Sequence, residues 1–127
     1  MQNVACVFSY QTSNWVSCQK IVSNLWKSYQ LLPKTQISKF NYSKELGLSQ
    51  IEDLAQSIYK EKPEIISFID HLPHPLLLMA HLASLYYEEE KPRIIFHLFG
   101  DFSLNFAQWE KLGQLLVDWP VDFFVAS

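Results

Sequence analysis

Three polar side chains, Asp70, His71 and His74, stand close together at the end of the apolar run 64–70 and just beyond it. A carboxylate beside an imidazole can orient the ring and raise its basicity, as a general base that takes a proton from a hydroxyl would need. A purely structural interpretation also exists, in which Asp70 ends a strand, His71 faces solvent and His74 caps the next helix. Because the three groups share one short segment, we keep acid–base chemistry as a hypothesis for this position.

A second candidate position follows the apolar run 93–99, where Gly100 and Asp101 form a Gly-Asp pair. Gly-Asp after a strand is first of all a turn signal, but it also puts a carboxylate at the end of that strand. His97 lies inside the run, two residues before Phe99, so the two side chains point to the same face of a strand. We therefore expect His97 to be packed against a layer of helices rather than to be catalytic.

Apolar runs alternate with amphipathic stretches along the whole chain, in the order strand, helix, strand. Near-continuous apolar strands that alternate with helices predict a parallel sheet covered on both faces. The expected fold is α/β, a three-layer doubly wound (Rossmann-like) sandwich with about five mainly parallel strands, whose order stays open. The strands are expected at 4–10, 35–42, 64–70, 93–99 and 121–127, and the helices at 14–30, from 49 to Pro63, from Pro75 to the acidic 88–90, and at 104–118.

Local signals place the ends of two of these helices. Ser49 and Glu52 in "SQIE" predict a capping box at the start of the second helix. The three glutamates at 88–90 oppose the dipole at the end of the third helix, so that end is expected to fray.

Ligands of open parallel sheets bind beyond the carboxyl ends of the strands, at a topological switch point. The expected strand ends therefore bring the candidate residues to one edge of the sheet. The candidates for catalysis are Asp70, His71 and Asp101, the candidates for substrate binding are Ser9, Tyr10, Ser13, His74 and Gly100, and no metal site is expected.

Composition and missing motifs exclude several classes of function. A formal net charge of −3 with scattered basic residues gives no reason to expect nucleic acid as a partner. No stretch reaches the roughly 18 apolar residues of a membrane span, and no secretory signal is visible, so a cytoplasmic location is expected. With three glycines in the chain, neither a GxGxxG turn nor a Walker A loop is present, nor a GxSxG elbow, and we expect no cofactor. Cys6 and Cys18 are expected to be reduced, partly buried thiols.

Three segments carry a resemblance to a known family. "KPEIISFIDHLPHPLLLMAHLASL" resembles the amino-terminal half of glycosyltransferases with the two-Rossmann-domain (GT-B) fold, in which a strand end rich in His and Asp precedes a leucine-packed helix. "KPRIIFHLFGDF" is similar to that family's next strand, which faces the acceptor, and "VDFFVAS" to the strand that leads toward the second domain.

The resemblance implies the acceptor-side domain of an enzyme that moves a sugar from a nucleotide-sugar donor to an acceptor hydroxyl. Its catalytic group would be Asp70, His71 or a residue of 97–101. The donor would be held mainly by a second domain, so residues 1–127 alone are expected to be catalytically silent. The glycine-rich turn of many family members is absent after the first strand.

A receiver-like domain of two-component signalling is the alternative, with Asp70 in the place of the phosphorylated aspartate. Ser9 and Tyr10 stand where that family has an acidic pair for Mg²⁺, and Ser127 stands where it has a lysine. Such a domain would be degenerate and would act through protein contacts. A non-catalytic interaction module is a third reading.

The last expected strand ends at the end of the sequence, at Ser127. If that strand is covered on both faces, a further segment, a partner domain or a second copy of the chain must help to cover it. We therefore expect residues 1–127 to form one Rossmann-like domain, the amino-terminal part of a longer two-domain protein.

Overall fold

The computed structural model describes residues 2–14, 16, 18–70, 75–98, 106–115, 119 and 122–126. Strands and helices alternate along this chain as the sequence predicts. Their bounds are β1 (Gln2–Ser9), α1 (Tyr10–Asn14), α2 (Gln19–Gln30), β2 (Thr35–Tyr42), α3 (Leu48–Lys60), β3 (Ile65–Asp70), α4 (Leu76–Leu85), β4 (Arg93–Leu98), α5 (Phe106–Leu115) and β5 (Phe123–Ala126).

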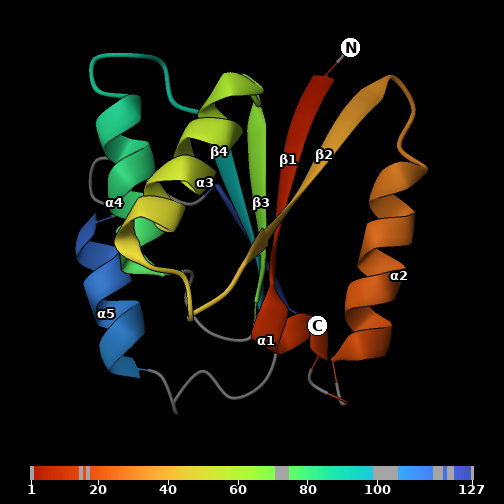
Figure 1. Ribbon diagram of the computed structural model, residues 1–127. Helices are drawn as coiled ribbons and strands as arrows, with labels where there is room; N and C mark the ends of the chain where they lie inside the picture. Colours follow the sequence, from red (N-terminus) through yellow and green to blue (C-terminus); the bar gives the residue numbers. More distant parts are fainter. Residues whose placement is uncertain are drawn as a thin grey trace.

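The five strands form one sheet in the order β2-β1-β3-β4-β5, and every neighbouring pair is parallel (Figure 1). All five carboxyl ends therefore lie at the same edge. Since β2 lies on one side of β1 and β3 on the other, the winding of the chain reverses between β1 and β3. In doubly wound sheets this reversal is the switch point at which ligands bind.

Helices cover both faces of the sheet, which confirms the predicted three-layer doubly wound α/β fold. Figure 1 shows α2 on one face and α3, α4 and α5 on the other. On the α3–α5 face, the side chains that are completely shielded from solvent include Ile58, Ile66, Phe68, Leu78, Met79, Leu82 and Ile94. On the α2 face, the buried cluster consists of Val4, Cys6, Phe8, Cys18, Val22 and Ile69.

Where one helix is expected at 14–30, α2 spans Gln19–Gln30, and a separate short helix, α1, spans Tyr10–Asn14, almost wholly before the expected range. Helix α1 starts directly after β1 because the Ser9 hydroxyl accepts a hydrogen bond from the Thr12 backbone N–H (3.3 Å), as an N-cap residue does. At its other end, the Asn14 side-chain amide donates to the Tyr10 carbonyl (2.8 Å). A side chain that occupies the carbonyl four residues earlier competes with continuation of the helix.

The capping box predicted at Ser49 and Glu52 was wrong by two residues. Helix α3 begins at Leu48 with Gly47 as its N-cap, and the Gln50 Oε1 atom accepts a hydrogen bond from the Gly47 N–H (2.8 Å). Glycine has no side chain, so only this half of the box forms. Ser49 lies within the first turn, where its hydroxyl is not needed as a cap.

Three residues that follow helices have a left-handed backbone, with φ of 52° at Lys34, 49° at Lys62 and 62° at Glu88. The left-handed conformation is the one that glycine usually adopts at a helix C-terminus, and it costs a residue with a Cβ atom about 1 kcal/mol.

Helix α4 ends at Leu85, so the acidic residues 88–90 lie beyond the helix and not in its last turn.

Replacing Lys62 by glycine should therefore stabilise the protein. We expect the free energy of unfolding of Lys62→Gly to rise by about 0.5–1 kcal/mol, because relief of the left-handed strain exceeds the added entropy of the unfolded chain. Urea denaturation measures this change. The control, Gln56→Gly in the exposed interior of α3, should lower the same free energy by about 0.5–1 kcal/mol. Destabilisation by both variants would contradict the assignment of strain to Lys62.

Candidate functional site

Four of the predicted site residues lie at the carboxyl edge of β1 and β3, next to the switch point. Ser9 ends β1, Tyr10 and Ser13 belong to α1, and Asp70 ends β3. Ser9 and Asp70 are buried, Ser13 is partly buried, and Tyr10 is exposed over 59% of its surface. The other four, His71, His74, Gly100 and Asp101, lie outside the described residues, and their roles stay predictions.

A hydrogen bond crosses the switch point. The Thr12 hydroxyl of α1 donates to the Oδ1 atom of Asp70 over 2.7 Å. Thr12 is completely buried and Asp70 is 4% exposed. The bond thus joins the segment that follows β1 to the end of β3, and it gives a buried carboxylate a hydrogen-bond donor.

A buried tyrosine, Tyr42 at the end of β2, belongs to the same edge. Its own burial, together with the negative charge of Asp70, raises the pKa of Tyr42. The phenol therefore stays protonated at neutral pH. The edge combines a carboxylate with protonated hydroxyl groups, which are the partners a buried charge requires.

Helix α1 is also held from the side of β2. The Gln11 side chain donates from Nε2 to the Ser43 hydroxyl (3.2 Å), and its Oε1 atom accepts from the Lys44 backbone N–H (3.3 Å). Gln11 therefore connects α1 to the β2–α3 turn, while the next residue, Thr12, connects it to β3. Short segments fixed on two sides hold their side chains in one geometry, which a binding or catalytic site needs.

This arrangement suits proton transfer involving a hydroxyl. A single carboxylate with a hydroxyl donor can accept a ligand O–H and take its proton. Among the described residues, no group of three or more His, Cys, Asp or Glu side chains is arranged to hold a metal ion.

Sequence reasoning missed Thr12, because residues 11–13 are expected only to connect the strand at 4–10 to the helix at 14–30. The available signal was the spacing of Ser9 and Thr12, in which a serine precedes the third residue of a helix, as in an N-cap. A short helix without an apolar stripe has no periodicity that would reveal it. The buried role of Thr12 therefore had no signal of its own.

His97 is buried on the α2 face, as expected, and takes part in a chain of polar groups. The Tyr29 hydroxyl of α2 lies 2.7 Å from the His97 Nε2 atom and 2.7 Å from the Ser67 hydroxyl of β3. Within the described part of the chain, the buried Nδ1 atom of His97 has no hydrogen-bond partner. Burial lowers the pKa of His97, so the ring is neutral in the folded protein at neutral pH.

The two cysteines are free, and both are buried rather than partly buried as expected. Burial raises the pKa of Cys6 to about 12. A neutral thiol is a poor nucleophile, so Cys6 acts as a small apolar side chain beneath α2.

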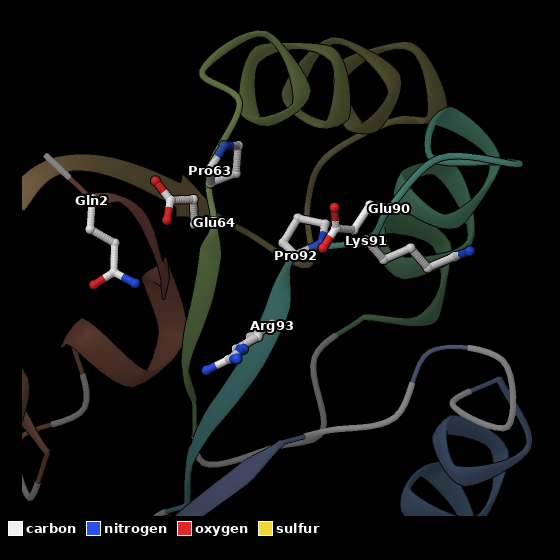
Figure 2. Close-up of a pocket in the computed structure, with 7 residues that line it drawn as sticks. All are labelled: Gln2, Pro63, Glu64, Glu90, Lys91, Pro92 and Arg93. Carbon is white, nitrogen blue, oxygen red and sulfur yellow. The ribbon is translucent and has the colours of Figure 1, made fainter.

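Two clefts lined by described residues lie at the opposite, amino edge of the sheet. One, of about 510 Å³, is drawn in Figure 2 and is lined by Gln2, Pro63, Glu64, Glu90, Lys91, Pro92 and Arg93. Figure 2 shows the side chains of Glu64 and Arg93 extending toward the side of Gln2, whereas Lys91 points away from them. The charged side chains of this cleft are of both signs, and three of them, Glu64, Glu90 and Arg93, are exposed, so they give no clear preference for an anion or a cation.

The second cleft, of about 410 Å³, lies beside the ends of α3 and α4 and includes Tyr59, Tyr86 and Glu89. The Tyr59 hydroxyl donates to both carboxylate oxygens of Glu89 (2.8 Å each). The Tyr86 hydroxyl is buried without a partner among the described residues, and burial with the nearby Tyr59 and Glu89 raises the pKa of Tyr86 to about 12. That oxygen is shielded from solvent, so a ligand in the cleft would not reach it.

Comparison of the chain with protein-family models, with curated proteins and with solved structures found no match. Among the described residues, no helix is both long enough and apolar enough to cross a membrane.

Removing the Tyr29 hydroxyl should destabilise the fold. Tyr29→Phe keeps the ring but leaves the Ser67 hydroxyl and the His97 Nε2 atom without this partner, which should cost about 1–3 kcal/mol of unfolding free energy. Chemical denaturation measures the loss. The control Tyr87→Phe, at a tyrosine that is 74% exposed, should stay within about 0.5 kcal/mol of wild type. Equal effects of the two changes would contradict the buried hydrogen bonds.

Stability should fall as the pH is lowered through the range in which unfolded histidine titrates. The pKa of His97 lies below its ordinary value of 6.5 in the folded protein, so the unfolded chain binds more protons there. The free energy of unfolding should then decrease below about pH 6.5 by up to roughly 1.4 kcal/mol per pH unit. His97→Gln, which keeps a polar side chain without titrating, should have a shallower pH dependence. Identical slopes for wild type and variant would refute the buried neutral imidazole.

Proposed function

We propose that residues 1–127 form the acceptor-side domain of a glycosyltransferase, an enzyme that moves a sugar from a nucleotide-sugar donor to an acceptor hydroxyl. In this proposal Asp70 accepts the proton of the acceptor hydroxyl. The observation that carries the proposal is the buried Asp70 carboxylate beside the β1–β3 switch point, where it accepts the Thr12 hydroxyl over 2.7 Å.

The position of Asp70 supports this chemistry. A carboxylate already hydrogen-bonded to one hydroxyl lies in surroundings that tolerate hydroxyl donors, and a second hydroxyl from a ligand is a natural partner. Tyr10, exposed at the start of α1, offers an aromatic surface at the same edge. The resemblance of the strand ends to the glycosyltransferase family adds to the proposal.

The strand order is compatible with a Rossmann-like sheet. Removing the third strand from the order 3-2-1-4-5-6 leaves 2-1-4-5-6, which becomes 2-1-3-4-5 when the strands are renumbered. The observed order β2-β1-β3-β4-β5 is therefore that of a Rossmann sheet without its outer third strand. Both arrangements have the switch point beside the first strand, where Asp70 lies.

The donor would be held mainly by a second domain in this proposal. The β1–α1 connection has no glycine, and α1 follows β1 without an intervening loop. In dinucleotide-binding folds, glycines at this turn let a pyrophosphate approach the backbone closely. The β1–α1 connection of this chain has no such glycines. The isolated domain should bind an acceptor but transfer no sugar.

A degenerate receiver-like signalling domain is the second candidate, and the strand order favours it. The order 2-1-3-4-5 is also that of flavodoxin-like folds, which include receiver domains. Asp70 at the end of β3 would then be the phosphate acceptor. Ser9 and Tyr10, where Mg²⁺ ligands would be needed, speak against phosphoryl transfer.

Binding of hydroxylated ligands tests the first candidate. A ¹⁵N-labelled chain would be titrated with a panel of monosaccharides, glycerol and serine-containing peptides at millimolar concentrations. At least one ligand should shift the amide signals of 9–14 and Asp70. Asp70→Asn should weaken that ligand about tenfold or more, because hydrogen bonds to charged groups contribute about 1.5–3 kcal/mol. The control Asp53→Asn, the same change at an exposed site on α3, should leave binding unchanged.

Three outcomes would overturn the proposal: no binding by any member of the panel, shifts confined to the amino edge, or equal effects of the two aspartate variants. Treatment of the chain with acetyl phosphate and Mg²⁺ distinguishes the two candidate functions. Phosphorylation of Asp70 under those conditions would favour the receiver-like candidate instead.

A further inference from the structure

We infer that Thr12 is a positioning residue, whose hydroxyl keeps the Asp70 carboxylate ionised and in one orientation at the edge of β1 and β3. The role of an ionised Asp70 in catalysis rests on the proposed function. The effect of the Thr12 hydroxyl on the protonation of Asp70 does not depend on that function and can be measured separately.

The geometry is that of a short hydrogen bond from a hydroxyl to a carboxyl oxygen. The Thr12 Oγ1 atom lies 2.7 Å from the Asp70 Oδ1 atom, and both side chains are almost fully removed from water. Burial by itself favours the protonated form of a carboxyl group, whereas a hydroxyl that donates to the carboxylate favours the charged form. The Thr12 hydroxyl therefore opposes the effect of burial on Asp70.

The backbone around Thr12 holds its hydroxyl in place. Its own N–H is bound by the Ser9 hydroxyl, and the preceding residue, Gln11, bridges to Ser43 and to the backbone of Lys44. These bonds hold the backbone of α1 against β1 and the β2–α3 turn, so that the Thr12 side chain stays within reach of Asp70. The donor is thus placed before any ligand arrives.

An ionised Asp70 is what the proposed transfer needs. As the acceptor oxygen forms its bond to the anomeric carbon, the bond from that carbon to the nucleotide breaks and its electron pair leaves with the nucleotide. The proton of the acceptor hydroxyl passes to Asp70. A carboxyl group that was already protonated could not take it.

Carboxyl ¹³C NMR of Asp70 tests the inference. The variant Thr12→Val keeps the shape of the side chain but removes the hydroxyl. The titration midpoint of Asp70 should lie about one to two pH units higher in this variant than in the wild-type chain. Thr12→Ser, which restores the hydroxyl, should titrate close to wild type. The control Thr35→Val makes the same change at the amino end of β2, where the threonine hydroxyl donates to Pro33, and it should not move the midpoint.

An unchanged midpoint in Thr12→Val, or an equal shift in Thr12→Ser, would overturn the inference. If Thr12→Val fails to fold, a measurement on the wild-type chain still tests the inference. Its Thr12 hydroxyl proton signal should then shift with the same pH midpoint as the Asp70 carboxyl carbon, and independence of the two signals would overturn the inference. Failure to bind sugars would instead contradict the proposed function, and the titration result for Thr12 and Asp70 would remain valid.

Discussion

A buried carboxylate at the carboxyl edge of a sheet needs a hydrogen-bond donor, and this requirement links the fold to the site. Asp70 ends β3 beside the point where the winding of the chain reverses, and Thr12 of α1 supplies the donor. The parallel order of the strands brings the two residues together although they are 58 positions apart in the sequence. The short helix α1 is then held by what its side chains bind, because five residues are too few to form a stable helix on their own.

The two faces of the sheet are held to their helices in different ways. On the α3–α5 face, aromatic and aliphatic side chains dominate, including the stacked rings of Phe68 and Phe96 with centroids 5.0 Å apart. On the α2 face, an apolar contact is combined with polar groups, where Tyr29 meets Ser67 and His97. Buried polar groups make a docked position specific, because only one arrangement satisfies their hydrogen bonds. The position of α2 is therefore fixed by hydrogen bonds as well as by apolar burial.

Periodicity predicted the architecture well and the local ends less well. The strand expected at 35–42 has the observed bounds of β2, and the other strands differ by one or two residues at an end, because long apolar runs leave little choice of conformation. The short helix α1 at 10–14, before the helix expected at 14–30, could not be predicted from the sequence, since it depends on hydrogen bonds of Ser9 and Asn14. The placement of Asp70 followed from strand polarity. The role of Thr12 depends on strand order, which the sequence left open.

The coupling between Thr12 and Asp70 tests this account most directly. A double-mutant cycle combining Thr12→Val with Asp70→Ala isolates the free energy of their interaction from the individual effects of each change on stability. The account predicts a coupling of about 1.5–3 kcal/mol at neutral pH, as for a hydrogen bond to a charged group. A coupling indistinguishable from zero would show that the bond across the switch point does not hold the site together.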